Sequence, residues 1–188
     1  EQSGFITDMG FETYQKILAE AMEELGVETG IVTKNSGESF VSDCTIETDQ
    51  LALIPDSYID MTAEKIRIYK ELDSLTSDKE AEMLKTKLAD RFGPVPEELL
   101  RLFDIVKIRQ LGQKLGFEKI IIKNGVMIAF FISNPLSQYY RSNRFSKILE
   151  SISVHPNLFE LKQNDSKLRI FVRNIDSISK AYDILKRL

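Results

Sequence analysis

The chain has 188 residues, 43% of them hydrophobic, which is enough for one core and a short appended segment. The longest unbroken apolar stretch, residues 126–132, is far shorter than the roughly 20 residues that span a bilayer, so we expect a cytoplasmic protein with no membrane partner. The single cysteine, Cys44, excludes an internal disulfide and a zinc finger. The formal net charge of −4 combines −11 over residues 1–60 with +7 over residues 61–188, an asymmetry that marks either a partner surface or ordinary solvated faces.

The first 60 residues contain a predicted helix, a linker and a strand. Apolar residues recur at steps of three and four from residue 11 to residue 25, which predicts a separate amphipathic helix. Residues 27–40 are rich in Gly, Thr, Ser and Asn and lack periodicity, so we interpret them as a linker. Imperfect alternation over residues 44–53 predicts a strand with a register shift, followed by a turn at Pro55 and Asp56.

Three helices are predicted next, each from an apolar stripe that we expect in the core. Ser77 and Glu80 have the spacing of a capping box and mark the start of the second helix. The second and third helices meet at a corner, in which Gly93 ends one helix and Pro96 begins the next. The stripes consist of Ala63, Ile66, Tyr69 and Leu72 in the first helix, Ala81, Leu84, Leu88 and Phe92 in the second, and Leu99, Leu102, Phe103, Val106, Leu111 and Leu115 in the third.

The last third of the chain changes to β-type patterns. Asn124 and Gly125 lie between two β-rich runs and predict a hairpin, because both turn residues tolerate positive φ. A second hairpin is predicted from residues 158–162 and 168–172, with a helix over 136–152 before it and another over 176–188 after it. We therefore predict the α+β class, with helices packed on a small antiparallel sheet built from two hairpins.

The sequence contains no recognisable catalytic constellation. No glycine-rich phosphate loop is followed by Lys and Ser or Thr, and the only histidine, His155, precedes a proline in a predicted loop. Glu47 and Asp49 would share one face of a strand, but carboxylates at this spacing are common on surfaces. We expect no catalytic residue, no metal site and no cofactor in this chain.

Binding of nucleic acid is an alternative that the basic C-terminal half raises. From Arg101 to the end there are 16 Lys and Arg residues against seven Asp and Glu. Cations near aromatic residues can contact phosphates while bases stack, and a basic surface facing solvent or protein would show the same composition. The candidate residues are Arg141 and Arg144, which follow two tyrosines, and Arg169 and Arg173, which would share a strand face with Phe171.

Several short motifs, in a fixed order, resemble one protein family. They are residues 10–18 (GFETYQKIL), 54–59 (IPDSYI), 65–70 (KIRIYK), 90–93 (DRFG) and 105–109 (IVKIR). Together they are similar to the C-terminal module of bacterial transcription-repair coupling factors. The resemblance implies that residues 1–26 are the tail of a helicase lobe, that 27–40 are a linker and that 41–188 are a C-terminal regulatory domain. The chain would then be a fragment of a longer polypeptide.

The resemblance also implies a function without chemistry in this fragment. In the family, the parent protein is an ATP-driven DNA translocase that removes stalled RNA polymerase from DNA and recruits the repair protein UvrA. Its C-terminal domain folds back on a UvrB-like N-terminal module and covers the surface that binds UvrA. We expect the contact at the acidic start of the second predicted helix, at Asp78, Glu80 and Glu82; the alternative is that these carboxylates only complement the helix dipole.

Overall fold

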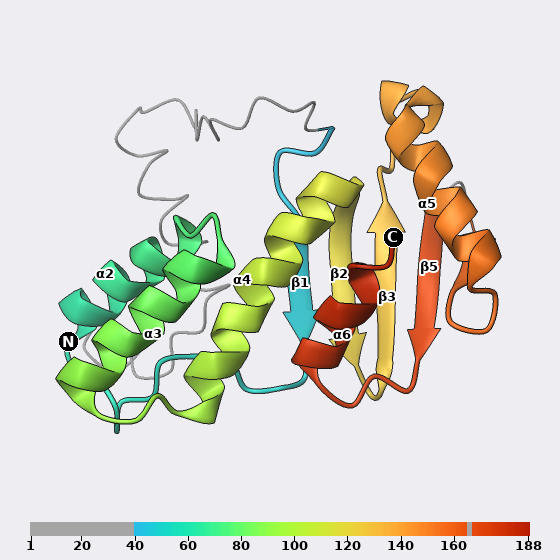
Figure 1. Cartoon of the computed structure of the whole chain (residues 1–188). Coiled ribbons are helices and arrows are strands. Elements are labelled where there is room, and N and C mark those ends of the chain that lie inside the picture. Colours follow the sequence, from blue (N-terminus) through green and yellow to red (C-terminus); the bar gives the residue numbers. More distant parts are fainter. Residues whose placement is uncertain (1–39, 165–166) are drawn as a thin grey trace, which may run out of the picture. The chain divides into compact units, whose positions relative to one another are not determined.

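The computed structural model describes residues 40–164 and 167–188, and these fall into two compact units (Figure 1). Residues 51–103 form what we call the helical unit, and residues 40–50 together with 104–188 form the sheet unit. The predicted helix at 11–25 and nearly all of the predicted linker at 27–40 lie outside the described residues.

The helical unit contains the three predicted helices. They are α2 (Thr62–Asp73), α3 (Asp78–Phe92) and the beginning of α4 (Glu97–Leu115), which continues into the sheet unit. The stripes of α3 and α4 were largely predicted correctly, because their side chains form most of this core: Ala81, Leu84, Leu88, Leu99, Leu102 and Phe103 are all at most 3% exposed.

The prediction for α2 was partly wrong. Ala63 is exposed and Ile66 only half-buried, whereas Lys65 and Ile68 take the buried positions beside Tyr69. The ammonium group of Lys65 pairs with the carboxylate of Asp56, in the turn before the helix. Because the charge is paired, the long aliphatic stem can be buried, and α2 is rotated relative to the prediction.

The corner between α3 and α4 is held by Tyr58. Gly93 has a φ of +89°, as the sequence predicted, and the Tyr58 hydroxyl lies 2.9 Å from its carbonyl oxygen and 3.1 Å from that of Leu88. Leu88 is buried as expected. Phe92, which we predicted in the core, is only half-buried; its ring lies beside that of Tyr58, with centroids 5.8 Å apart.

The sheet unit is built on a five-stranded sheet with the strand order β1-β2-β3-β5-β4. This confirms the α+β class and both predicted hairpins. The short strand β1 pairs in parallel with β2, so the sheet is mixed rather than wholly antiparallel, and β1 is shorter than the predicted strand at 44–53. The strands are β1 (Thr45–Thr48), β2 (Phe117–Lys123), β3 (Val126–Phe131), β4 (Glu160–Asn164) and β5 (Lys167–Arg173).

The first hairpin turns at Asn124 and Gly125, whose φ angles of 52° and 72° are those of the predicted turn. The second joins β4 to β5, and its turn, at 165–166, lies outside the described residues. The predicted helix at 136–152 is broken. A short 3-10 helix, η1 (Gln138–Arg141), is followed by α5 (Asn143–Val154), because the hydroxyl of Ser142 accepts the N–H of Phe145 and starts a new helix.

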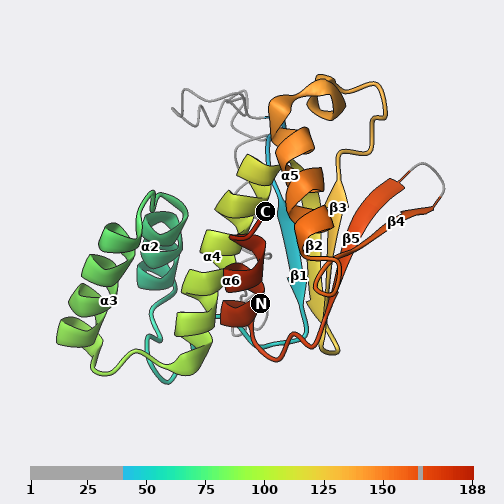
Figure 2. The same ribbon diagram turned by 45° about the vertical axis from the view of Figure 1, so that its right-hand side comes forward.

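Helices cover one face of the sheet. Figures 1 and 2 show α5, α6 (Ile178–Leu185) and the sheet-unit part of α4 on the same side of the strands. The alternate side chains that point to this side are at most 6% exposed: Ile46, Ile120, Ile122, Met127, Ala129, Phe131, Ile170 and Val172. In the last segment, Ala181, Ile184 and Leu185 of α6 are buried and Leu188 is half-buried. No described helix of the sheet unit lies over the opposite face.

Candidate partner-binding surfaces

The acidic start of α3 is exposed, and one of its three carboxylates is part of a helix cap. The hydroxyl of Ser77 accepts the N–H of Glu80 at 3.3 Å, as the capping-box spacing predicted. The carboxylate of Glu80 in turn accepts hydrogen bonds from the N–H and the hydroxyl of Thr76, at 2.7 and 2.9 Å. These bonds hold the pKa of Glu80 below its ordinary value. Glu80 therefore stabilises the start of the helix whether or not a partner is present.

Asp78, Glu82 and Met83 form what we call the α3 acidic surface. The side chains of Glu82 and Met83 are 67% and 63% exposed, and Asp78 is exposed in the first turn. Glu82 pairs with Lys85 at 2.8 Å, and an exposed pair of this kind contributes little to stability. This surface lies away from the buried stripe of α3, so it combines acidic groups with an apolar side chain that the fold itself does not use.

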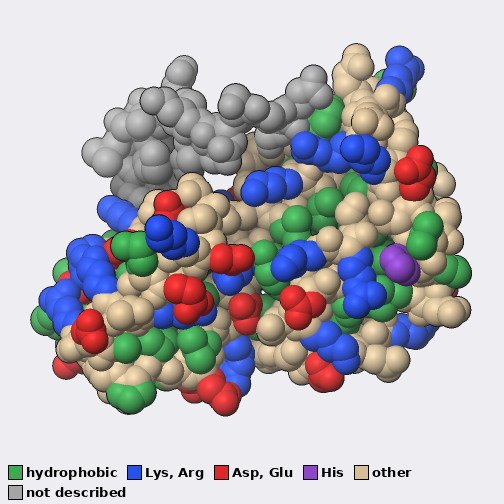
Figure 3. Space-filling model, in the orientation of Figure 1, with side chains coloured by type: hydrophobic (Ala, Val, Ile, Leu, Met, Phe, Trp, Pro, Cys, Tyr) green, Lys and Arg blue, Asp and Glu red, His purple; other side chains and the backbone are tan. Residues whose placement is uncertain are grey.

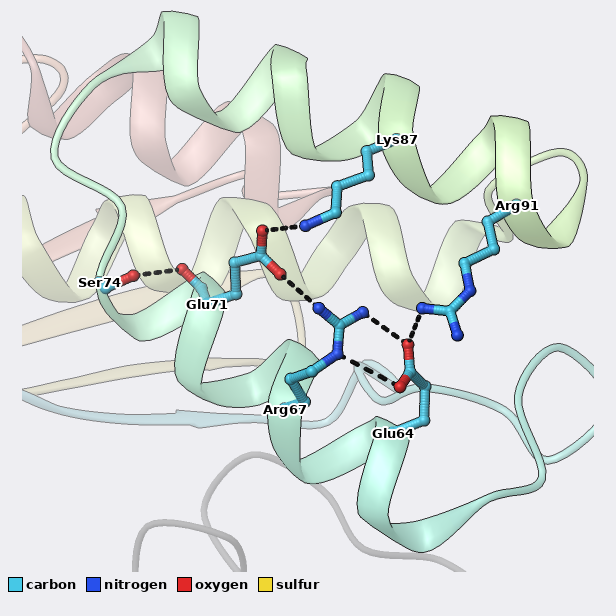
Figure 4. A network of polar contacts seen from close by, with 6 residues as sticks. All are labelled: Glu64, Arg67, Glu71, Ser74, Lys87 and Arg91. Carbon is cyan, nitrogen blue, oxygen red and sulfur yellow. Dashed lines mark hydrogen bonds and ion pairs between the residues drawn. The ribbon is translucent and has the colours of Figure 1, made fainter.

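Basic side chains farther along α3 are paired with α2. Figure 4 shows Glu64 between two guanidinium groups, with 2.6 Å to Arg67 and 2.5 Å to Arg91, while Glu71 pairs with Lys87 at 2.7 Å. The hydrogen bond from Arg67 is the main cause that lowers the pKa of Glu64. Lys87 and Arg91 in the C-terminal half of α3 are thus partly neutralised within the helical unit. The α3 acidic surface is confined to the N-terminal half of the helix. Figure 3 agrees, because acidic and basic side chains are interspersed over α2 and α3.

The four arginines considered for nucleic acid are not brought together. Arg141 ends η1, and Arg144 lies in the first turn of α5, a helix on the covered side of the sheet. Arg169 and Arg173 alternate with the buried Ile170 on β5 and therefore project from the opposite face. The prediction that Arg169, Phe171 and Arg173 share a face is confirmed by this alternation.

The sheet face that no described helix of the sheet unit covers carries charged side chains around a half-buried apolar centre, and we call it the open sheet face. Its centre is Ile121, Ile128, Phe130 and Phe171, and its rim is Glu47, Lys119, Lys123, Glu160, Lys162, Arg169 and Arg173. The contributions of β2 and β3 to this face were not predicted from the sequence. They could have been found by continuing the alternation outward from the predicted turn at Asn124 and Gly125.

Glu47 and Asp49, the two carboxylates that the sequence predicted on one strand face, have structural partners. Glu47 accepts from Lys119 at 2.5 Å and Lys123 at 3.2 Å, and these bonds lower its pKa, which is opposite to what a general acid requires. Asp49 accepts the N–H of Asn124 at 2.7 Å, beside the hairpin turn. Both residues tie β1 or its end to the first hairpin.

Three further possibilities concern the described residues: a role for His155, a metal site and a membrane-spanning helix. The backbone N–H of His155 donates to the carbonyls of Ser151 and Ile152 at the end of α5. Within residues 40–164 and 167–188, no group of three or more His, Cys, Asp or Glu side chains is placed to hold a metal ion. In the same part of the chain, no helix is long and apolar enough to cross a membrane.

Comparison with known proteins agrees with the motifs. The family model of the TRCF domain matches residues 48–142. The transcription-repair-coupling factor of Rickettsia typhi is 33% identical over 176 residues, which are 93% of this chain and 14% of that protein. Those of Escherichia coli and Bacillus subtilis are 33% and 34% identical over 64% of this chain and 10% of their own lengths. The chain therefore spans only about a seventh or less of these relatives.

A solved structure supports the same assignment at the level of the fold. The crystal structure of the C-terminal domain of a transcription-repair coupling factor superimposes with a TM-score of 0.59 at 24% sequence identity, covering 79% of this chain and 90% of that one. The family match begins at the end of β1 and includes the whole helical unit and the first hairpin. The chain belongs to the TRCF domain family of transcription-repair-coupling factors.

Proposed function

We propose that this chain is a non-catalytic regulatory domain of an ATP-dependent DNA translocase that couples transcription to nucleotide excision repair. Family membership supports the parentage, and the partners of the whole protein would be RNA polymerase, UvrA and DNA, in the cytoplasm. Residues 1–26 would be the tail of a helicase lobe, 27–40 a linker and 41–188 the regulatory domain. The carboxylates that could do acid-base work are engaged in holding strands and turns, which supports a role in binding.

The regulatory role would be autoinhibition of the parent protein. In this proposal the domain covers the UvrA-binding surface on a UvrB-like N-terminal module of the same polypeptide. The observation that carries it is the α3 acidic surface, where the exposed carboxylates of Asp78 and Glu82 lie one helical turn apart and Met83 is an exposed apolar side chain on the same stretch of helix. A small apolar anchor with charged neighbours suits a partner surface that carries arginines.

Such a surface also suits a contact that must open. The side chains that hold α3 in place, including Leu84 and Leu88, are on its other face, so undocking leaves the helical core intact. Masking is a two-state equilibrium, and UvrA shifts it only by binding the open state better than the closed one. A modest interface keeps the difference between the two states within reach of one binding partner.

The test reverses charge and removes the anchor in the full-length parent protein. Glu82→Lys with Met83→Ala should raise the ATPase rate and tighten UvrA binding, while the isolated domain keeps its thermal stability. Glu80 is left unchanged because its substitution would also remove the cap. The matched control is Asp90→Lys, an exposed acidic residue of the same helix, eight positions beyond Glu82 and about 12 Å away along the axis.

The control should leave both activities at the level of the unmodified protein. If the double variant folds normally and its ATPase rate and UvrA affinity equal those of the Asp90→Lys control, the α3 acidic surface is not the masking contact. If deletion of residues 41–188 from the parent also leaves both unchanged, the autoinhibitory role itself is wrong.

A further inference from the structure

The open sheet face has a layout that differs from a plain solvent-exposed sheet. In its central row, Ile121 is paired with Ile128, which is paired in turn with Phe171. In the adjoining row, Phe130 has Lys119 on one side and Arg169 on the other. The two rings therefore occupy neighbouring strands at diagonal positions, where side chains as large as phenylalanine are within reach of each other.

Charge on this face is strongly unequal. Five cationic side chains surround the apolar centre, against the two carboxylates of Glu47 and Glu160, and Lys167 projects from the same face at the far end of β5. Each carboxylate lies between two cations. Glu160 is 2.9 Å from Lys162 and 3.4 Å from Arg173, and Glu47 has the two lysine partners already described. One cation per carboxylate is enough to neutralise it, so the face has an excess of positive charge that is complementary to an anionic ligand.

The aromatic rings and cations are interleaved. The ammonium of Lys162 is 4.7 Å from the ring centroid of Phe171, and the guanidinium of Arg169 is 5.2 Å from it. Flat rings and guanidinium planes accept stacked bases, and the neighbouring ammonium groups can turn toward phosphates. An anionic polymer with exposed planar bases matches both features, whereas an acidic peptide matches only the charge.

We propose that the open sheet face binds single-stranded nucleic acid, with bases stacked on Phe130 and Phe171 and phosphates near the five cations. A duplex fits less well, because its bases are stacked on each other and cannot reach half-buried rings. The proposal is independent of the autoinhibitory function, since it concerns the sheet unit and needs no partner module. Of the four arginines predicted from the sequence to bind nucleic acid, this proposal keeps Arg169 and Arg173 and omits Arg141 and Arg144.

The test is fluorescence anisotropy with the whole 188-residue chain. The probes are labelled oligo-dT and oligo-U of about 10 nucleotides, within the usual site size of such surfaces, and a DNA duplex of the same length. Both single strands should bind more tightly than the duplex. The affinities for oligo-dT and oligo-U show whether the face prefers DNA or RNA. Each cation that contacts a phosphate should contribute about 0.7 to the slope of log affinity against log salt.

Two variants separate charge from stacking. Lys119→Gln with Lys123→Gln should weaken binding about tenfold at low salt and reduce the salt slope by about 0.7, because one of the two ammonium groups neutralises Glu47 and the other is the phosphate contact that is lost. Its matched control removes the same charge from η1 and α5, which are not strands of the open sheet face, through Arg141→Gln with Lys147→Gln, and this pair should bind like the unmodified chain.

Phe171→Leu removes the stacking ring and should weaken binding about fivefold or more without changing the salt slope. Ile128→Leu, in the same row of the face, is its control and should have no effect on affinity. Circular dichroism of each variant shows that it is folded. Because the lysine substitutions are at exposed or half-exposed positions, they test the face even if Phe171→Leu disturbs the sheet.

Three results would overturn the proposal. One is the absence of binding to either single strand at low salt. Another is a duplex affinity equal to that of the single strands. The third is an acidic polyglutamate probe that binds as tightly as the oligonucleotides and is insensitive to Phe171→Leu, because this outcome would assign the face to an acidic protein segment.

Discussion

Replacing Gly116 with alanine tests the packing at the end of α4. Gly116 has a φ of +86°, and a Cβ atom there would lie 2.2 Å from Cε2 and 2.5 Å from Cζ of the Tyr139 ring. The ring is fully buried, and its hydroxyl donates to the carbonyl oxygen of Leu115 at 2.5 Å. The rings of Phe131 and Phe145, with centroids 6.1 and 5.3 Å away, limit its movement on other sides.

The expected loss of stability has two parts. A side chain at positive φ costs about 1–2 kcal/mol, and overpacking against a ring that cannot move costs about 1–3 kcal/mol more. Gly116→Ala should therefore lower the free energy of unfolding by about 2–5 kcal/mol. Gly125→Ala is the matched control in the same unit, because its φ is +72° but the nearest atom to a new Cβ is 3.9 Å away. The control should lose only about 1–2 kcal/mol.

Urea unfolding followed by far-UV circular dichroism measures both values. A second comparison combines Gly116→Ala with Tyr139→Leu, where removal of the ring should make the pair less destabilising than the sum of the single changes. If Gly116→Ala and Gly125→Ala lose the same stability, and the double variant is simply additive, the Tyr139 ring does not press on the end of α4 and the packing described here is wrong.

Two further predictions concern side chains whose burial the structure assigns. Burial, with a smaller contribution from Asp43, raises the pKa of the Cys44 thiol to about 12. Because only the thiolate reacts, a maleimide at pH 8 should label the native protein roughly 10³-fold more slowly than the urea-unfolded chain. Comparable labelling rates would mean that the thiol is accessible. Leu88→Ala should cost about 2–5 kcal/mol and Phe92→Ala only about 1–2 kcal/mol in urea unfolding, because the Phe92 ring is half-exposed; the reverse order would contradict the described corner.

Features set by neighbouring residues were predictable from sequence. The turn at Asn124 and Gly125 depends only on which residues tolerate positive φ, and the cap at Ser77 and Glu80 depends on a spacing of three. For the candidate sites, the same local logic placed Arg169 and Arg173 on one strand face and put the three carboxylates on the exposed start of α3.

Features set by distant residues were not predictable in this way. Lys65 is buried because Asp56 supplies its countercharge, and helical periodicity alone favours Ala63 instead. The parallel pairing of Thr45 with Lys119 requires the chain to return after the whole helical unit. Pairing between residues so far apart leaves no pattern in a short stretch of sequence. Neither the mixed sheet nor the full extent of the open sheet face could therefore be predicted from the local sequence.

The helical unit is inserted in the sequence between β1 and β2, so the sheet unit is made of two separate segments of the chain. No single truncation of the chain isolates the sheet unit intact. A fragment that begins at Leu51 would lose β1, and Lys119 and Lys123 would then lose the carboxylate of Glu47. A protease cut within residues 51–103 would instead leave two pieces joined by strand pairing, including the bond from Asn124 to Asp49. Nicking of the parent protein at this place would therefore show on a denaturing gel and stay hidden in native gel filtration.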